Sequence, residues 1–161
     1  MADGSKVPEV RLRPVTDQDF DVFFAFEADP VAAAMAAFPS RDKEAFAAHW
    51  ARVSANETAL RRAIVADGVV AGNIGSWDQE GERLLGYWIG REHWGRGIAT
   101  EALAQFLRLD VTRPLLAHVA SHNAGSARVL EKCSFQRGPA REAAAPPADD
   151  DIEELIFVLP A

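Results

Sequence analysis

A glycine-containing segment between a predicted strand and a predicted helix constrains this chain most: Trp94-Gly95-Arg96-Gly97-Ile98-Ala99-Thr100. It follows an apolar run, Leu84 to Ile89, and precedes an amphipathic run, Ala99 to Val111. Glycines let the backbone turn sharply and let a ligand come close to it. The first amides of the following helix have no partner within the helix and lie at the positive end of its dipole. The segment therefore predicts a strand–loop–helix unit that attracts phosphate.

A Gly-x-Gly sequence alone also fits a plain tight turn, so we compared it with other nucleotide-binding motifs. Thr100 stands where a dinucleotide-binding loop has its third glycine, and the Gly-Lys-Ser/Thr of a P-loop is absent. Arg96 adds a fixed positive charge inside the segment. The segment is thus a candidate pyrophosphate site that belongs to neither of these two classes.

Length and composition exclude several classes of protein. With 161 residues, one domain is expected, over residues 9–161, after a flexible tail at residues 1–8. The net charge of −7 argues against a general nucleic-acid binder. The single cysteine and four scattered histidines give no disulfide and no metal-ligand pattern. There is no signal pattern at residues 1–8 and no apolar run of membrane-spanning length, so we expect a cytoplasmic protein without a membrane partner.

The N-terminal part predicts one strand followed by helices. Apolar and charged residues alternate in the strand, and aromatic residues recur at helical spacing in the segments that follow. The predicted elements are a strand at Val10–Pro14, a helix that Thr16 caps and Asp29-Pro30 ends, a short alanine-rich helix to Ala37, and a helix that Ser40 caps.

The remaining chain predicts a strand meander and two further helices. Asp67-Gly68 is a hairpin signal between two strand-like runs. The predicted strands are Leu60–Ala66, Val69–Trp77, Leu84–Ile89, Leu115–Ala120, a short one from Phe135 and a last one at Ile152–Leu159; the helices are Ala99–Val111 and Asn123–Lys132, and Gly138–Asp151 is a predicted mobile loop. The expected fold is α/β: a mixed, mostly antiparallel twisted sheet with helices on both faces and one parallel pair within residues 84–120.

A second segment, Asn123-Ala124-Gly125-Ser126-Ala127-Arg128-Val129-Leu130-Glu131-Lys132-Cys133-Ser134-Phe135, resembles the Asn-x-x-Ser…Leu-Glu-Lys-x-Gly-Phe segment of the GNAT family of N-acetyltransferases. Tyr87-Trp88-Ile89 and the glycine segment lie before it in the order and at the separation of that family. Arg11-Leu12-Arg13-Pro14 is similar to its first strand. The chain looks most like the branch that acetylates the N-termini of ribosomal proteins, and the resemblance extends from about Val10 to Leu159.

The resemblance implies acetyl-coenzyme A as donor, an amine as acceptor and no metal. Backbone groups of three strand residues would pair with the pantetheine arm, the loop would hold the pyrophosphate, and Asn123 would bind the arm near its sulfur. Ser126 would lie beside the thioester as the catalytic residue, and Arg128 would reach the nucleotide. The implied coenzyme site is Tyr87, Trp88, Ile89, Trp94, Gly95, Arg96, Gly97, Ile98, Ala99, Thr100, Asn123, Ser126 and Arg128.

The chain departs from the family pattern at three positions. Glu92 stands where members have Gln or Arg, so we expect it to face away from the phosphates while Arg91 and Arg96 supply charge. Ser134 replaces a glycine and is strained if its φ is positive. Leu130 stands where many members have a tyrosine as general acid, which leaves Ser126 as the candidate.

The sequence leaves several questions open. The base is His118, His122 or a glutamate, and one of Tyr87 and Trp88 faces the cleft while the other faces the core. Cys133 has core spacing with Leu130, so we reject it as an acyl carrier. The acceptor is a small-molecule amine or a protein N-terminus, the chain is a monomer or homodimer, and the alternative function is a non-catalytic acetyl-coenzyme A-binding module.

Overall fold

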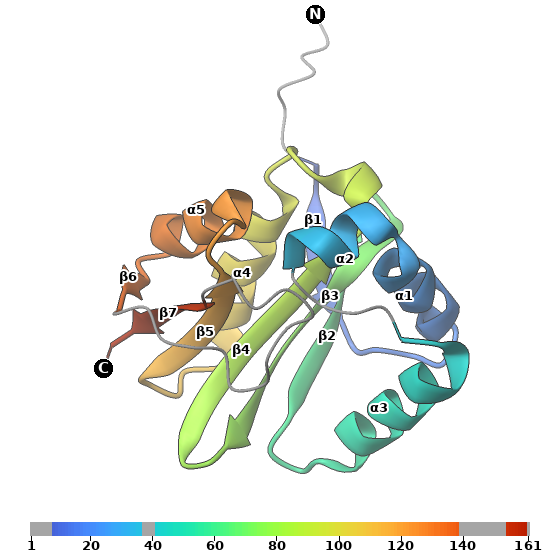
Figure 1. Ribbon diagram of the computed structural model, residues 1–161, viewed down its shortest axis with the longest axis horizontal. Coiled ribbons are helices and arrows are strands. Elements are labelled where there is room, and N and C mark those ends of the chain that lie inside the picture. Colours follow the sequence, from blue (N-terminus) through green and yellow to red (C-terminus); the bar gives the residue numbers. More distant parts are fainter. Residues whose placement is uncertain (1–7, 37–40, 139–153, 161) are drawn as a thin grey trace, which may run out of the picture.

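The computed structural model describes residues 8–36, 41–138 and 154–160, and within them strands and helices follow the expected order (Figure 1). The elements are β1 (Val10–Arg13), α1 (Asp19–Ala28), α2 (Pro30–Ala36), α3 (Lys43–Ala55), β2 (Leu60–Ala66), β3 (Val69–Gln79), β4 (Glu82–Ile89), the 3-10 helix η1 (Arg91–His93), α4 (Ile98–Leu109), β5 (Leu115–Ala120), α5 (Ala124–Lys132), β6 (Gln136–Arg137) and β7 (Glu154–Leu159). The tail at 1–8 lies almost wholly outside these residues, as does most of the predicted loop at Gly138–Asp151.

The described strands form one sheet in the order β1-β2-β3-β4-β5-β7-β6. Every neighbouring pair is antiparallel except β4 and β5, which are parallel. The chain passes from β4 to β5 through α4, because parallel neighbours need a crossover connection. The prediction of a mostly antiparallel sheet with one parallel pair is confirmed.

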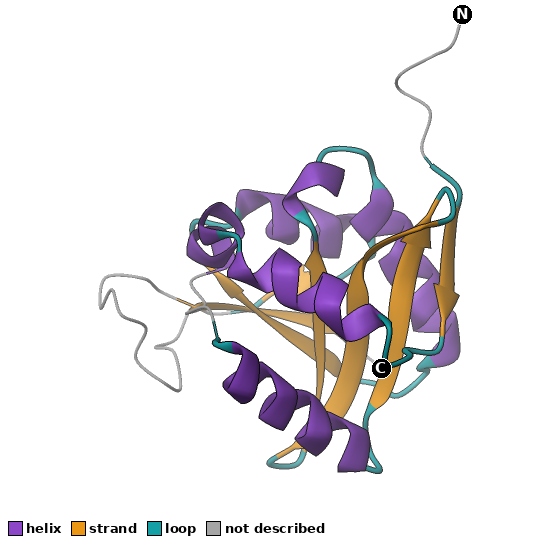
Figure 2. Cartoon of the chain, turned by 90° about the vertical axis from the view of Figure 1, so that its right-hand side faces the viewer, coloured by secondary structure: helices purple, strands orange, loops and turns teal. Residues whose placement is uncertain are grey.

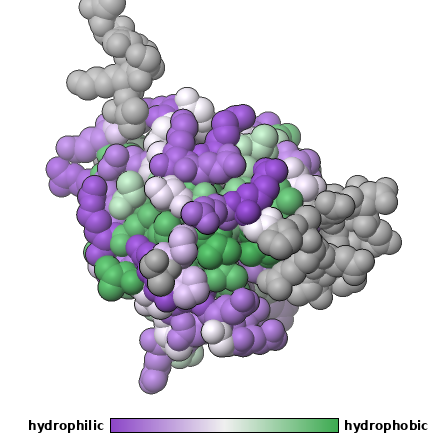
Figure 3. Space-filling model, turned by 90° about the vertical axis from the view of Figure 1, so that its left-hand side faces the viewer, coloured by the Kyte–Doolittle hydropathy of each residue, from purple (hydrophilic) through white to green (hydrophobic). Residues whose placement is uncertain are grey.

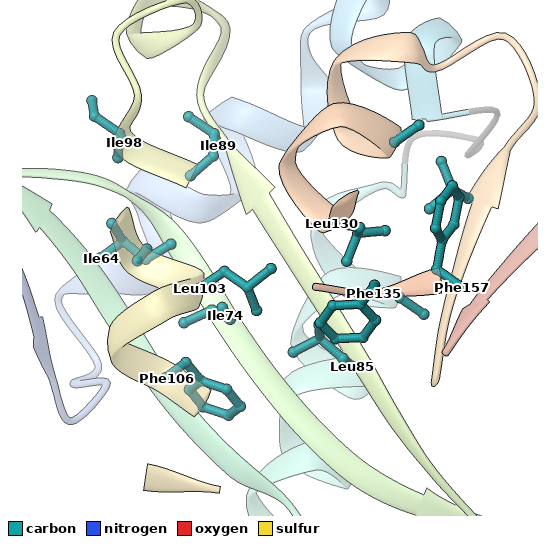
Figure 4. Packing of buried hydrophobic residues seen from close by; sticks show 14 of the residues in the cluster. Ile64, Ile74, Leu85, Ile89, Ile98, Leu103, Phe106, Leu130, Phe135 and Phe157 are labelled. Atoms are coloured by element: carbon teal, nitrogen blue, oxygen red, sulfur yellow. The ribbon is translucent and has the colours of Figure 1, made fainter. Parts of the chain in front are cut away.

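Helices cover both faces of the sheet, as the side view in Figure 2 shows. Side chains alternate between the two faces of a strand. Ile64 and Ile74 therefore pack with Leu103 and Phe106 of α4, while Ala63 packs with Trp50 of α3 and with α1. Figure 4 shows the α4–α5 side of this core, where Leu130 and Phe135 close it.

Two predicted helix caps are wrong. Thr16 does not cap α1; its amide donates to the carboxylate of Asp19 at 2.8 Å, and Arg13 holds the same carboxylate at 2.7 Å. Asp19 is only 3% exposed, so its charge is satisfied by these partners and not by the helix dipole alone. α3 is capped by Asp42, whose carboxylate accepts from the amide of Ala45, while Ser40 lies outside the described residues.

The end of α5 confirms the expected strain at Ser134. Its φ is +74°, in the left-handed region. The Ser134 amide donates to the carbonyl of Glu131, and the Phe135 amide donates to that of Leu130. These two bonds form a Schellman motif, a helix end that usually has glycine at this position.

A buried polar cluster joins the start of β4 to β3 and to the C-terminal end of α4. Arg83 of β4 donates to the carboxylate of Asp110, 2.9 Å away, and to the hydroxyl of Ser76, which itself donates to Asp110. Burial opposes ionisation of Asp110, but these hydrogen bonds outweigh it and leave its pKa below the ordinary value. The cluster therefore holds β3, β4 and the end of α4 together.

The surface on the α5 and β6 side carries hydrophilic side chains around a central apolar area (Figure 3). No helix among the described residues is long and apolar enough to cross a membrane. The same part of the chain contains no cluster of three or more histidine, cysteine or acidic side chains that could hold a metal ion.

Candidate active site

The central feature of the site is an opening between β4 and β5. The two strands pair only at Arg83–Leu85 and Leu115–Ala117. Beyond Leu85, β4 continues to Ile89 paired with β3 alone, and beyond Ala117, β5 continues to Ala120 paired with β7 alone. The facing edges of these segments therefore keep backbone donors and acceptors free for a ligand that adds like a strand.

The glycine segment lies directly beyond this opening, because it follows the end of β4. Gly95 and Gly97 have φ values of +75° and +80°, which glycine adopts without strain. Gly97 occupies the cap position of α4 with no side-chain capping bond, so the amides of Ile98, Ala99 and Thr100 keep their outward donors. A Cβ at Gly95 would meet no atom within 4 Å. This open, amide-lined turn fits the pyrophosphate of a coenzyme.

Charged residues around the turn lie differently from the prediction. Arg91 forms an ion pair with Asp29 at 2.7 Å, so the expectation that it supplies charge to the loop is wrong. Glu92 is exposed in η1, and Arg96, half-exposed, lies 3.8 Å from Asp67 of the β2–β3 turn. Arg96 is thus the loop's own positive charge, and its exposed partner holds it only weakly.

Trp94 has a structural role at the end of β4. Its indole nitrogen donates to the carbonyl of Ile89 at 2.9 Å, while the residue stays 38% exposed. The bond closes the turn from β4 into the loop and occupies one acceptor position of Ile89. Ile98 is buried in the core, so it can offer only its amide to a ligand.

Asn123 and Ser126 meet Tyr87 where α5 begins. The Asn123 side chain caps α5 by accepting from the amide of Ser126 at 3.1 Å, and its amide nitrogen bonds no other described residue. The Ser126 hydroxyl lies 2.7 Å from the hydroxyl of Tyr87, which also donates toward the Ser126 carbonyl at 3.3 Å. Tyr87 therefore links the open part of β4 to the first turn of α5.

Tyr87 lies on the α4–α5 face of the sheet, with Leu85 and Ile89 of the core. By strand alternation, Trp88 is on the opposite face. Burial raises the pKa of Tyr87 to about 12, although the bond with Ser126 opposes the rise. The phenol is therefore protonated at any working pH and can donate a hydrogen bond to Ser126.

Arg128 and Cys133 take no part in the contact between Tyr87 and Ser126. Arg128 is exposed on α5 and forms no ion pair with a described residue. Cys133 packs against the core, with its sulfur 3.7 Å from the carbonyl of Thr100. Burial and the nearby charge of Glu101 raise the pKa of its thiol, which keeps it protonated and supports rejecting it as an acyl carrier.

Sequence reasoning missed the side-chain role of Tyr87 and the hydrogen bond between His118 and Glu154. Strand alternation offered a signal for the first, because Leu85 and Ile89 are core positions and Tyr87 lies midway between them. Nothing in the sequence pairs His118 with Glu154, since the two residues belong to different strands and are 36 positions apart.

A parallel strand pair that opens beside an amide-lined helix terminus and a fixed hydroxyl is the architecture of an acetyltransferase domain. The family model described as "Acetyltransferase (GNAT) domain" matches residues 9–136, and the chain belongs to this family. The family uses acetyl-coenzyme A, and the backbone cradle described above suits that donor.

Individual relatives agree with the family at the level of the fold. A protein named "Uncharacterized N-acetyltransferase p20" from Bacillus licheniformis is 39% identical over 66 residues, which are 37% of this chain and only 36% of that relative. The crystal structure of a GNAT-family acetyltransferase from Bacillus anthracis superimposes with a TM-score of 0.79 at 14% identity, covering 96% of each chain. The structure of RimL, a ribosomal L7/L12 alpha-N-protein acetyltransferase in complex with coenzyme A, superimposes with a TM-score of 0.78 at 15% identity, covering 93% of each chain.

Proposed function

We propose that this protein is an acetyl-coenzyme A-dependent N-acetyltransferase that moves the acetyl group directly from the thioester to an amine. The observation that carries the proposal is the meeting of three features at one end of the sheet. The β4–β5 opening, the free amides of the α4 N-terminus and the Tyr87–Ser126 hydroxyl pair all lie where β4 and β5 end.

Each feature has a distinct role toward the donor. The amides from Gly95 to Thr100, with Arg96, hold the pyrophosphate. The open edge of β4, at Tyr87 and Trp88, pairs with the amide groups of the pantetheine arm. The free amide nitrogen of Asn123 donates to the same arm near its sulfur. Arg128, exposed on α5, reaches the nucleotide end.

Backbone and side-chain groups of this chain stabilise the charges that form during acetyl transfer. A free backbone amide at the open strand edge stabilises the oxyanion that forms when the amine attacks. Ser126 donates a hydrogen bond to the sulfur as the carbon–sulfur bond breaks, and Tyr87 orients the Ser126 hydroxyl for this donation. These interactions are stronger in the transition state than before it, so they raise kcat.

The acceptor is a small-molecule amine or a protein N-terminus. The ribosomal-protein branch of the family resembles this chain in its motifs, and RimL, which shares the fold, acts on a protein N-terminus. A panel of polyamines, amino acids, drug-like amines and short peptides, assayed by release of free thiol, tests this range. Binding of acetyl-coenzyme A without turnover on any member would favour a non-catalytic binding module instead.

Coenzyme binding is tested by thermal melting with acetyl-coenzyme A, because a ligand that binds only the native state must raise its stability. We expect a rise in Tm at millimolar acetyl-coenzyme A for the wild type and none for Gly95→Asp, whose carboxylate would oppose the phosphates. Gly81→Asp is the matched control, since Gly81 also has a positive φ, of +82°, and open space at its Cβ, but lies in the β3–β4 turn. A wild type without a shift, or an equal shift in both variants, would contradict the phosphate site.

A further inference from the structure

We infer that His118 is the base that accepts the proton of the acceptor ammonium, and that Glu154 is a positioning residue that holds the imidazole for this step. The inference rests on the proposed acetyl transfer and adds to it the group that makes the amine nucleophilic. Most amines are protonated near neutral pH, so the reaction needs such a group. His118 lies at the opening, is oriented by a carboxylate and presents an unused ring nitrogen.

The first observation is the place of His118 in the sheet. It is the first residue of β5 after Ala117, the last residue that pairs with β4. Its side chain shares a strand face with Leu116, which packs with Leu84 and Ile156 on the face opposite α4 and α5. His118 and the Tyr87–Ser126 pair therefore border the opening from opposite faces of the sheet.

On the β4 side of His118, the sheet face carries a glycine and the ring of Trp77. The next register position on β4, after Leu85, is Gly86, which has no side chain. A Cβ at Gly86 would lie 3.1 Å from the ring of Trp77, so a larger residue there would crowd this face. The Trp77 ring therefore covers Gly86, and in this proposal the acceptor enters beside that ring to reach the imidazole.

The second observation is the hydrogen bonding of the ring. Nδ1 of His118 lies 3.0 Å from a carboxylate oxygen of Glu154, the opening residue of β7. Because a carboxylate accepts, Nδ1 carries the hydrogen and Nε2 keeps its lone pair. Nε2 is buried and has no hydrogen-bond partner among the described residues. A buried polar atom without a partner destabilises the fold, so its retention calls for a function.

The third observation is the charge around the ring. Glu154 is the titratable group that the described strands bring against His118. In the strand register, His118 stands opposite Ile156 of β7 and at the position of Gly86 of β4, and neither of these residues titrates. The side chains of His118 and Glu154 are 26% and 25% exposed. Glu154 therefore fixes the tautomer and the orientation of the imidazole.

The protons balance as follows. His118 Nε2 accepts one proton from the acceptor ammonium, and the neutral amine attacks the thioester carbonyl carbon. The new carbon–nitrogen bond forms, the carbon–sulfur bond breaks, and the second proton of the nitrogen ends on the departing thiolate, on the side of Ser126. His118 then releases its proton to solvent. No redox step or further reactant is required.

The test compares acceptors that do and do not need a base. We would measure kcat/KM of the wild type and His118→Gln with an alkylamine, which is protonated at pH 7, and with an arylamine, which is neutral there. We expect a loss of about 100-fold or more with the alkylamine, the range of general base catalysis, and a loss below about threefold with the arylamine. A merely structural role of His118 would lower both rates equally and would overturn the inference.

Rate–pH curves provide the second measurement with an alkylamine alone. The wild-type curve should reach a plateau, whereas that of His118→Gln should keep rising toward the pKa of the amine. Glu154→Gln keeps the size of its side chain but not the carboxylate that holds Nδ1, and should lower kcat/KM with the alkylamine while leaving the arylamine rate and coenzyme binding intact. If His118→Gln fails to fold by circular dichroism, equal losses with both amines in Glu154→Gln overturn the assignment.

The matched control is His49→Gln in α3, away from the opening. Burial, together with nearby arginine charges, lowers the pKa of His49 to about 4, so it is uncharged at pH 7. This variant should keep the wild-type rates and rate–pH curve.

A wild type that binds acetyl-coenzyme A but acetylates no amine would overturn the proposed function and this inference together. An active wild type whose His118→Gln variant loses equal activity with both amines would overturn only the assignment of His118 as the base.

Discussion

The Tyr87–Ser126 pair allows a quantitative test of how the thiolate is stabilised. The two hydroxyl oxygens lie 2.7 Å apart, across a chain separation of 39 residues. Because burial raises the pKa of Tyr87 to about 12, its proton stays on the phenol and is available for donation to the Ser126 hydroxyl. The Ser126 proton is then free to point at the sulfur. The perturbations are Ser126→Ala, Tyr87→Phe and the double variant.

The expected magnitudes follow from the two kinds of hydrogen bond. A bond to a charged group contributes about 1.5–3 kcal/mol, so Ser126→Ala should lower kcat roughly tenfold to a few hundredfold. The bond between the two neutral hydroxyls contributes about 1 kcal/mol, so Tyr87→Phe should lower kcat about fivefold. Coenzyme affinity should change little in both, because both bonds act mainly in the transition state.

The assay is steady-state kcat at saturating acetyl-coenzyme A, with melting measured in parallel. If Tyr87 acts only through Ser126, adding Tyr87→Phe to Ser126→Ala should cost no further activity. The high phenol pKa also predicts that no fall in rate occurs between pH 8 and 10 from loss of this proton. Effects that multiply in the double variant, or an unchanged kcat with a lowered Tm for Ser126→Ala, would refute the reasoning.

Three further predictions concern stability and the lone cysteine. Ser134→Gly should raise the free energy of unfolding by about 1 kcal/mol in urea, because its φ of +74° suits glycine; a loss would contradict the strain. The hydrogen bond from Arg13 lowers the pKa of Asp19, so its stabilisation is present above the ordinary carboxyl value of about 4 and is lost as pH falls below it. Asp19→Asn should therefore cost about 2 kcal/mol at pH 7 and progressively less as pH falls below about 4 in denaturation curves, whereas a cost that does not change with pH would exclude the ion pair. Cys133→Ala should keep kcat within about twofold in the thiol-release assay, since its protonated, core-packed thiol carries no acyl group.

The coarse organisation of the domain could be predicted because it depends on local signals. The alternation of apolar and polar residues predicted the strands, and helical spacing of apolar residues predicted the helices on both faces of the sheet. The glycines between β4 and α4 predicted the position of the phosphate loop. Some boundaries failed for local reasons as well. The sequence predicts Thr16 as the cap of α1, but its amide bonds the carboxylate of Asp19, which Arg13 of the preceding strand also holds, and α1 begins without a side-chain cap.

The site itself depends on both the local sequence and the tertiary structure. The sequence by itself determined the turn at Gly95–Gly97, the amides beyond it, the capping residue Asn123 and the strain at Ser134, because neighbours in the chain fix φ, ψ and helix ends. Only the tertiary structure decided that Tyr87 meets Ser126, that Arg91 turns to Asp29 and that Glu154 orients His118. Those contacts depend on how far β4 and β5 remain paired and on the register of β7, which packing between distant segments sets and no local pattern encodes.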